Sequence, residues 1–435
     1  MLGAPSTSRV VRLPPPALHA AAAGSKAVPV AFTCTQRSAV QAAPRFVPPF
    51  ASGATPASCV AALIVTVGLG GTVTRTCAIV AGPDAKDAIA AQLTPPSLLQ
   101  RNAKAAGANP DAKTVARTLH FILPSLKAGE TATYLATIGK ETPSLSGYRW
   151  EDTKGKHATL SYADRPVLRY MYEAIDESTP ARRELTYKVF HHLYDPTGKR
   201  IVTKGAGGQF THHRGLFYGF NRISYAGGKK KCDTWHCRGA HLSHQGIAAA
   251  EVGTVLGRHV VEVHWHGPAK EVFATEQREM TVYNARGGQM VEFASRLASQ
   301  VGPVKLDGDP QHAGFQFRAD NEVAAKTKGQ TYYLRPDGQG KPGETRNWAA
   351  GKPDPRTVNL PFNAMSFVLG DTRYTAVYLD HPNNPKEARY SERDYGRFGS
   401  YFEFELDKDK PLELNYRLWL QAGEMTGDRV ATLKK

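Results

Sequence analysis

The sequence lacks the long apolar runs of a multispanning membrane protein. Its best candidate, Val60 to Leu69, is followed by Arg75 before about 20 apolar residues accumulate, the length that a membrane-spanning helix needs. Self-similarity with a period of 20–50 residues is also absent, which argues against a propeller or a solenoid. We therefore expect no stable membrane span and no repeat architecture.

Acidic residues are missing from the chain before Asp84. Residues 1–58 are rich in Ala, Pro, Ser, Val and Arg and show no helical or strand periodicity, so we expect them to be disordered or to precede the true start. The apolar segment at 59–82 has the length of a signal peptide, with small residues near its end. The sequence thus predicts a signal-like segment at 59–82, a linker at 83–115, and a periplasmic or secreted protein.

A concentrated basic surface is lacking as well, despite a net charge of +16. Residues 1–115 carry ten Lys/Arg and three Asp/Glu, which is +7, and the remaining +9 is spread over the rest. The one dense run, Lys229 to Lys231, follows Gly227-Gly228 and is typical of a loop tip. No basic helix face and no nucleic-acid motif is present, so we exclude nucleic acid as a partner.

Beyond residue 116 the hydrophobicity alternates with a period of two. In Leu412 to Leu420 the even positions are all apolar or aromatic and most odd positions are polar, which indicates a half-buried strand. Similar stretches are separated by turn signals such as the one at 307–310. The pattern predicts an all-β fold, a large antiparallel β-sandwich over residues 116–435 with few, short helices.

Cysteine is scarce, and three of the five cysteines lie in the N-terminal region: Cys34, Cys59 and Cys77. Cys232 and Cys237 remain, and in an oxidising compartment they could form a small-loop disulfide that stiffens the segment between them. Free thiols and a zinc site are the alternatives. C-x4-C is not a standard zinc spacing and no second cysteine pair exists, so we predict the disulfide and no metal.

Histidines gather in the middle of the chain. His212 and His213 follow the Gly-rich segment 205–208, and His236 and His244 follow the next loop signal. Histidine can donate or accept a proton near neutral pH, or ligate a metal. Each one alone is compatible with a surface or hydrogen-bonded core residue, but the set, with Arg214 nearby, predicts a binding or catalytic surface.

The strand expected at 259–266 separates polar from apolar side chains. Alternate residues of a strand point the same way, so Glu262, His264 and His266 share one face. Val263 and Trp265 then point to the opposite face, toward the core.

Five motifs in order carry a family resemblance: Phe190-His191-His192-Leu193-Tyr194, Thr211-His212-His213-Arg214-Gly215-Leu216-Phe217, Trp235-His236 with Gly239 and His244, Gly314-Phe315-Gln316-Phe317-Arg318, and Leu379-Asp380-His381-Pro382-Asn383-Asn384-Pro385. Over about 119–420 the chain resembles a bacterial domain family of unknown function that is often labelled "methane oxygenase PmoA". The label is a misnomer for this chain, because the membrane methane monooxygenase subunit needs several long apolar helices.

The resemblance implies an exported protein of polysaccharide-degrading bacteria, with a sandwich similar to the galactose-mutarotase supersandwich. That fold hosts epimerases, hydrolases and lyases, so it implies a carbohydrate ligand without fixing the reaction. One departure is visible. Where an acidic residue would precede the paired histidines, this chain has Gln209-Phe210-Thr211.

We therefore predict a carbohydrate-active enzyme that uses histidine as general acid and base. His212 or His213 would be paired with His236 or His244, and Asp380 would complete the catalytic set. The predicted substrate-binding residues are Arg214, Trp235, Arg318, His381 and Asn383. The sequence names no cofactor.

Two alternatives remain open. Hydrolysis could use a carboxylate such as Glu262 or Asp380, although no carboxylate pair stands out. The protein could also bind carbohydrate without catalysis. For the enzyme, His213 and His236 must converge, either on the face of one concave sheet, which we favour, or through a loop folded back over it.

Overall fold

The computed structural model of the protein describes the backbone of residues 28–35, 59–68, 77–81, 89–99, 114–123, 131–139 and 147–433, and the side chains of 89–99, 117–122 and 147–433. Within these residues the strands form four sheets, and every ladder is antiparallel. The predicted all-β sandwich is confirmed. The helical segments are short: α1 (Pro180–Thr186), α2 (Gly427–Leu433), and single turns at Val323–Thr327, Lys328–Gln330 and Pro355–Thr357.

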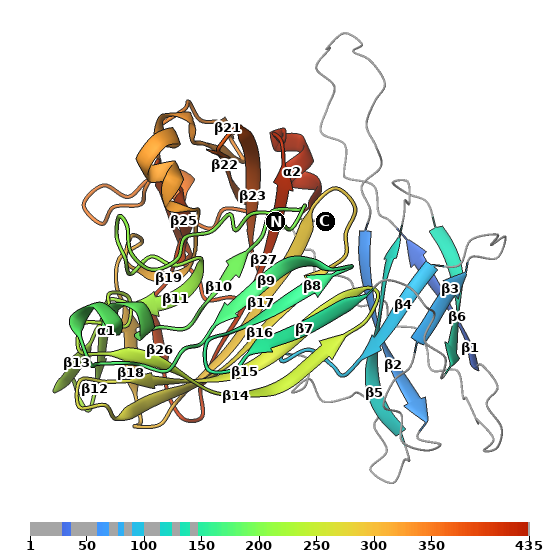
Figure 1. The fold of residues 1–435 in the computed structure, drawn as a ribbon, viewed down its shortest axis with the longest axis horizontal. Helices are drawn as coiled ribbons and strands as arrows, with labels where there is room; N and C mark the ends of the chain where they lie inside the picture. The colour runs from blue at the N-terminus through green and yellow to red at the C-terminus, as the bar shows by residue number, and fades with distance from the viewer. Residues whose placement is uncertain are drawn as a thin grey trace, which may run out of the picture.

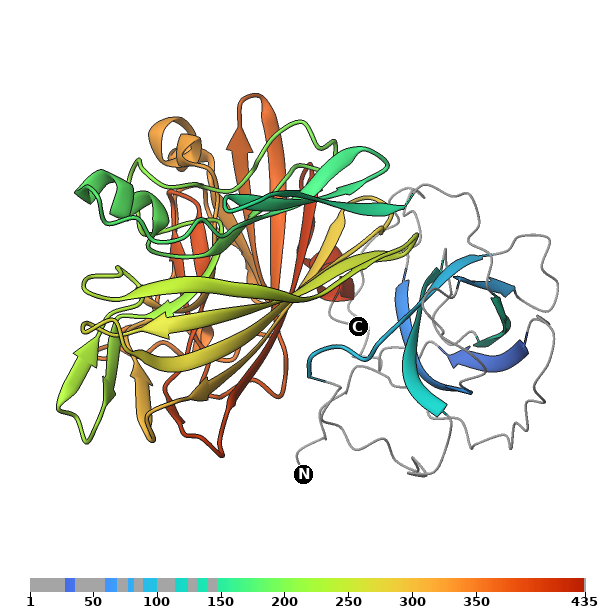
Figure 2. The same ribbon diagram turned by 60° about the horizontal axis from the view of Figure 1, so that its bottom comes forward.

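Two large sheets form the sandwich (Figure 1). The eight-stranded sheet has the order β24 (Arg389–Arg393), β25 (Arg397–Tyr401), β19 (Ala313–Arg318), β11 (Leu216–Phe220), β10 (Phe190–Leu193), β9 (Arg165–Met171), β8 (His157–Tyr162), β7 (Tyr148–Thr153). The nine-stranded sheet has the order β14 (His241–Val252), β15 (Leu256–His266), β16 (Val272–Tyr283), β17 (Gln289–Ser299), β27 (Leu412–Ala422), β23 (Thr372–Asp380), β22 (Asn363–Leu369), β20 (Tyr332–Arg335), β21 (Gly338–Gln339). Figure 2 shows the long strands β14 to β17 side by side across the molecule.

A smaller four-stranded sheet lies at one end of the sandwich and shares its core. Its order is β13 (Lys230–Cys232), β12 (Arg222–Tyr225), β18 (Val304–Asp307), β26 (Phe404–Leu406). Ile223 and Leu306 bring this sheet into the main hydrophobic cluster. Lys229 is exposed in the β12–β13 turn, as the sequence predicts for a loop tip.

The alternating pattern of the sequence places the core. In β27, Leu412, Leu414 and Tyr416 are buried while the residues between them are partly exposed. In β15, Glu262 is exposed and Val263 and Trp265 are buried, so the predicted division of that strand is confirmed. Apolar side chains from the facing sheets therefore meet in one continuous core.

One buried ion pair lies inside this core. Glu276 of β16 accepts hydrogen bonds from Arg278 Nε at 2.8 Å and Nη2 at 2.8 Å, from Trp265 Nε1 at 2.9 Å and from Ser295 Oγ at 2.9 Å. The Glu276 and Arg278 side chains are 0% and 1% exposed. Both carboxylate oxygens are satisfied, and the network ties β15, β16 and β17 together.

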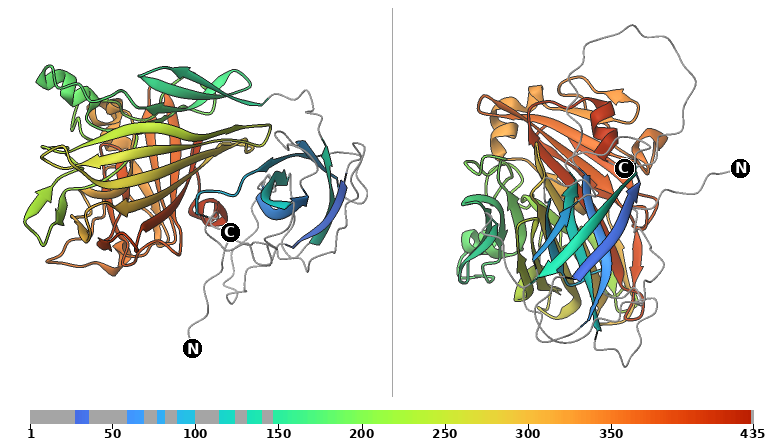
Figure 3. Two further views of the ribbon diagram at one scale, coloured as in Figure 1. Left: turned by 90° about the horizontal axis from the view of Figure 1, so that it is seen from below. Right: turned by 90° about the vertical axis from the view of Figure 1, so that its right-hand side faces the viewer.

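A fourth sheet is built from the N-terminal strands: β1 (Val28–Thr35), β6 (Thr131–Gly139), β3 (Cys77–Ala81), β4 (Ile89–Thr94), β5 (Thr114–Leu123), β2 (Cys59–Gly68). Figure 3 shows it, in blue to teal, beside the sandwich. Gln92 Oε1 accepts hydrogen bonds from the backbone amides of Val255 at 3.2 Å and Leu256 at 2.9 Å, so β4 contacts the start of β15.

The domain boundaries read from the sequence differ from this arrangement. The sandwich strands begin at β7, whereas β6 and all but the first two residues of β5 fall within 116–435 and pair with N-terminal strands. Strands β1, β2 and β3 fall in the segments predicted to be disordered or signal-like, most of which lie outside the described residues. Export and the N-terminal boundaries stay predictions.

Among the described residues, no helix is long and apolar enough to cross a membrane.

Candidate functional site

The outer face of the eight-stranded sheet carries the candidate site. In β11, Leu216, Tyr218 and Phe220 point into the main core, so Phe217 and Gly219 point to the outer face. Phe217 joins a separate buried cluster there, which contains Trp235. Loops fold over this face in place of another sheet.

Gly219 lets one loop lie flat on the sheet. A Cβ at this position would stand 2.8 Å from the carbonyl oxygen of Thr234, so a side chain would push the loop away. The Thr234 amide donates to Phe220 O at 3.0 Å, and the Phe220 amide donates to Thr234 Oγ1 at 3.1 Å. The segment after β13 is thereby fixed on the sheet, and it carries His236.

Two buried lysines hold the loop that carries His212 and His213. Lys188 Nζ donates to the carbonyls of His212, at 3.3 Å, and of Trp235, while Lys204 Nζ donates to His213 O at 3.3 Å. Burial lowers the pKa of Lys188 to about 8 and that of Lys204 to about 7. Both lysines bind carbonyls, so they position the histidines and add positive potential beneath them.

The four histidines His212, His213, His236 and His312 line one cavity of about 380 Å³, together with Phe210, Tyr395 and three arginines; we call it the histidine cavity. Ring centroids lie 4.3 Å apart for His212 and His213, 4.4 Å for His212 and His236, and 5.2 Å for His236 and His312. The predicted convergence of His213 and His236 is thus present. It arises from loops folded back over the outer sheet face, and the preferred geometry, with both residues on strands of a concave sheet, is wrong.

Two of these histidines are each held by an aspartate three residues earlier. His236 Nδ1 donates to Asp233 Oδ2 at 2.7 Å, and His312 Nδ1 donates to Asp309 Oδ1 at 2.9 Å. A carboxylate on Nδ1 fixes the ring orientation and the tautomer, which leaves Nε2 for proton transfer. Two of the four histidines therefore have an acidic partner, and each partner lies on the same loop as its histidine.

The electrostatics differ across the cluster. Burial, with Lys188 nearby, lowers the pKa of His212 to about 2, and burial, with Arg397 nearby, holds the pKa of His213 well below its ordinary value. These two rings stay neutral near pH 7 and suit hydrogen bonding to a ligand. In His236 and His312 the aspartate occupies Nδ1, so Nε2 is the nitrogen that remains for general acid–base chemistry.

Two cationic side chains of the β24–β25 hairpin, Arg393 and Arg397, line the histidine cavity, and Arg318 of β19 contacts the lining residue Tyr395. Arg397 donates to Gln316 Oε1 at 2.9 Å and Ser391 Oγ at 3.1 Å, and Arg393 donates to Asn347 Oδ1 at 2.7 Å. Arg318 lies over the Tyr395 ring, with its guanidinium carbon 4.9 Å from the centroid, and burial lowers the pKa of Arg318 to about 10. Among the described residues, none of the three arginines forms an ion pair with a carboxylate.

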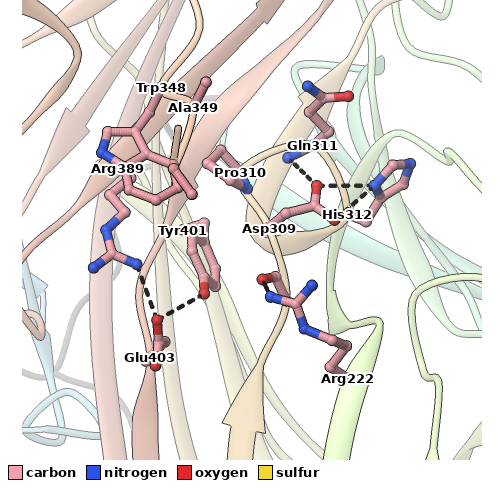
Figure 4. A pocket seen from close by; sticks show the side chains of 12 residues that line it. Arg222, Asp309, Pro310, Gln311, His312, Trp348, Ala349, Arg389, Tyr401 and Glu403 are labelled. Carbon is pink, nitrogen blue, oxygen red and sulfur yellow. Dashed lines mark hydrogen bonds and ion pairs between the residues drawn. The ribbon is translucent and has the colours of Figure 1, made fainter. Parts of the chain in front are cut away.

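A second cavity, of about 480 Å³, adjoins the first and shares Gln311 and His312 with it; we call it the tryptophan cavity. Figure 4 shows Trp348 and Arg389 on one side and His312 on the other. The Arg389 guanidinium lies 4.5 Å from the Trp348 ring centroid. An aromatic face bordered by polar groups is typical of a sugar-binding surface.

Two of the predicted ligand contacts are structural. Arg214 and Trp235 are both 0% exposed and do not line either cavity. Arg214 donates to the carbonyls of Thr211 at 3.0 Å, Leu185 at 3.0 Å and Glu184, so it joins the histidine loop to α1. In this structure Arg214 and Trp235 hold loops and do not line a cavity, so their predicted roles in substrate binding gain no support.

His244 lies outside the histidine cavity. It sits on β14, its Nδ1 is 3.3 Å from the Tyr170 hydroxyl, and its ring packs on Tyr172. The register of β14 against β15 places His244 opposite Val263. The predicted grouping of His244 with His236 is therefore wrong.

The residues predicted around Asp380 also form a separate group. Asp380 accepts from Asn384 at 2.5 Å and Lys386 at 2.5 Å, and burial raises the pKa of Asp380. The Asn383 amide donates to His381 Nδ1 at 3.2 Å. These contacts stabilise the turn after β23, and none of these residues lines either cavity.

The predicted disulfide is not formed. Cys232 and Cys237 are free, buried thiols. Cys232 ends β13 opposite Ile223, whereas the Cys237 thiol turns away to donate to Thr234 O at 3.3 Å. The competing prediction of free thiols fits this geometry.

Sequence reasoning missed His312, Tyr395, Arg393, Arg397 and Trp348. A usable signal existed for the first, because the pattern Asp-x-x-His occurs at both 233–236 and 309–312. The arginines offered no local signal, since they reach the site from a hairpin late in the chain.

The described side chains include no group of three or more His, Cys, Asp or Glu that could hold a metal ion.

Comparison with known proteins gives one family. The model described as "Family of unknown function (DUF6807)" matches residues 157–435, which contain both cavities. No curated protein matches the chain in sequence. Among solved structures, an alpha-mannosidase from Enterococcus faecalis V583 is similar at a TM-score of 0.40 and 10% identity, over 86% of this chain and 43% of the mannosidase chain. The chain thus spans less than half the length of that enzyme.

Proposed function

The chain belongs to the DUF6807 family of unknown function, and we propose that it is a carbohydrate-active protein whose histidine cavity performs acid–base chemistry on a sugar. The observation that carries the proposal is the pair of Asp–His dyads facing one cavity, with the His236 and His312 ring centroids 5.2 Å apart. Two imidazoles at this spacing can serve one substrate, one as base and the other as acid. Epimerase, lyase and hydrolase chemistry all use such a pair.

The tryptophan cavity supplies the second part of the proposal. Trp348, which is partly exposed, offers an aromatic surface to a sugar ring, and Glu403 and Arg389 offer polar atoms at its edge. Because the two cavities share His312, a glycan that lies against Trp348 would extend toward the dyads. Both volumes suit one or two sugar rings.

A non-catalytic carbohydrate-binding protein is the second candidate. The stacking of Arg389 on Trp348, which presents a fixed aromatic platform, favours it. We also propose that the protein is exported to the periplasm or outside the cell. The same proposal includes a relationship to the family labelled "PmoA" and a β-sandwich of the galactose-mutarotase supersandwich type.

The test is a screen of polysaccharides and oligosaccharides with the full chain, followed by mass spectrometry of products. We expect at least one glycan to be converted, and we expect His236→Ala and His312→Ala each to lower the rate by about 10²–10⁴-fold. His157→Ala on β8 is the matched control and should retain the wild-type rate. Binding without conversion would select the second candidate, and equal rates in the dyad variants would refute the acid–base role.

A further inference from the structure

The two cavities differ in how their arginines are neutralised. In the tryptophan cavity, Arg389 pairs with Glu403 at 3.0 Å and Arg222 pairs with Asp307 at 3.1 Å. In the histidine cavity, Arg393, Arg397 and the exposed Arg238 line the walls without a carboxylate partner among the described residues. The two aspartates at this site, Asp233 and Asp309, are each bound to a histidine. The histidine cavity therefore carries an excess of positive charge.

Several buried polar atoms of this cavity have no hydrogen-bond partner. His213 is 3% exposed and both of its ring nitrogens are unpartnered, and Arg397 is 1% exposed with an unpartnered Nε. Arg318, which lies over the ring of the lining residue Tyr395, leaves Nε and Nη2 unpartnered. Buried donors are nearly always satisfied in folded proteins, so a cluster of unsatisfied ones beside a cavity points to a missing acceptor.

We infer that the histidine cavity binds an oxyanion carried by the sugar, a carboxylate or a sulfate ester, with Arg397 and Arg393 as its principal partners. The inference rests on the proposed function for the sugar and on the arginines for the anion. The planar guanidinium fork matches a carboxylate or sulfate in two parallel hydrogen bonds. Arg238 at the exposed rim adds attraction for an acidic glycan.

A carboxylate at this place favours one kind of chemistry. When the arginines neutralise the carboxylate of a uronic acid, the proton on the adjacent carbon becomes more acidic. His236 Nε2 can accept that proton, and the electron pair of the broken C–H bond is delocalised into the carboxylate. In an epimerisation, His312, protonated on Nε2, donates a proton to the other face of the carbon; His236 keeps the abstracted proton, and exchange with solvent restores both rings. In an elimination, the pair forms a C=C bond and expels the glycosidic oxygen, which takes a proton from His312.

The test measures binding by calorimetry. The acidic probes are D-glucuronate, D-galacturonate and D-glucose 6-sulfate, the neutral hexoses are the references, and inorganic sulfate is the free-ion arm. We expect the acidic sugars to bind the full chain at least tenfold more tightly than their neutral counterparts. Arg397→Gln should remove this preference. Arg393→Gln, whose side chain is half-buried, repeats the test if the first variant does not fold, and Arg356→Gln, which pairs with Asp354 at the surface, is the charge-matched control.

The outcomes separate the inference from the proposed function. Neutral hexoses that bind as tightly as the acidic sugars would overturn the oxyanion inference and leave the carbohydrate function standing. Inorganic sulfate that binds in an Arg397-dependent way, with no sugar binding, would support the oxyanion site and overturn the carbohydrate function. Acidic sugars that bind equally well to wild type, Arg397→Gln and Arg393→Gln would overturn the assignment of these arginines.

Discussion

The buried ion pair of β16 gives the sharpest test of how the sandwich is held together. Replacing Glu276 by glutamine keeps the volume and removes the negative charge. In the variant, Arg278 stays charged although its side chain is 1% exposed. The donors of Arg278 and Trp265, which bind the Glu276 carboxylate in the wild type, then face a neutral amide group. Removing one partner of such a pair costs more than the pair itself contributes, because an uncompensated charge stays buried.

The expected loss is about 3–5 kcal/mol in the free energy of unfolding. A domain near the middle of the ordinary range, with a stability of about 10 kcal/mol, still folds after this loss. With a urea dependence of about 3 kcal/mol per molar, the midpoint falls by about 1–1.7 M. Tryptophan fluorescence is a suitable signal, since Trp265 touches the substituted group.

The control is Glu262→Gln on the neighbouring strand, which is exposed and should change the stability by less than about 0.5 kcal/mol. The double variant Glu276→Leu/Arg278→Met removes both charges and should recover at least half of the loss. A loss below about 1 kcal/mol in Glu276→Gln, or a double variant less stable than the single one, would refute the reasoning.

Three further predictions concern the site. Gly215→Ala should lower the melting temperature by several degrees, because Gly215 has a φ of +52° and a Cβ there would overlap a carbonyl oxygen of β10. Gly287→Ala, at a φ of +84° but in open space, should lower the melting temperature less. Equal losses in the two variants would contradict this reasoning. Thiol labelling should be slow in native protein, because burial raises the pKa of Cys232 to about 12 and also raises the pKa of Cys237. In denatured, unreduced protein both cysteines should be labelled. If neither is labelled there, the two cysteines form the disulfide. Burial alone would raise the pKa of Asp309, but hydrogen bonding to its histidine outweighs it and lowers the value to about 2, so its stabilisation is complete above about pH 4 and is lost as the pH falls toward 2. Thermal melts of Asp309→Asn should therefore differ from wild type at pH 6 and converge with it near pH 2, and a constant difference would count against the pairing.

The sequence predicts the fold well where the signal is local. The alternation in Leu412 to Leu420 and the two faces around Glu262 reappear in β27 and β15, because a strand with one buried face must alternate. The partners of β5 could not be read in this way. Its alternation is equally satisfied by either sheet, and only pairing with β2 and β4 decides the choice.

The residues of the candidate site were likewise predicted correctly only where the sequence signal is local. His213 and His236 were identified because their motifs are local, but His244 was grouped with them on sequence proximity alone, and the register of β14 carries it to Tyr170. Arg214 illustrates a second limit, since a conspicuous arginine beside paired histidines reads as a ligand contact until its burial is known. Burial of a polar group depends on long-range packing that no short motif records.

A short sequence motif can, however, encode an Asp–His dyad. In Asp233-x-x-His236 and Asp309-x-x-His312 the carboxylate also accepts a backbone amide of the same turn, at 2.8 Å from His236 and at 2.9 Å from Gln311. Each turn therefore holds its own histidine through hydrogen bonds within four residues of the chain. The fold brings the two turns together by laying one on Gly219 and by ending β18 beside the other. Asparagine at either aspartate should thus impair proton transfer more than binding, and equal losses in both would show that the turns serve only to shape the cavity.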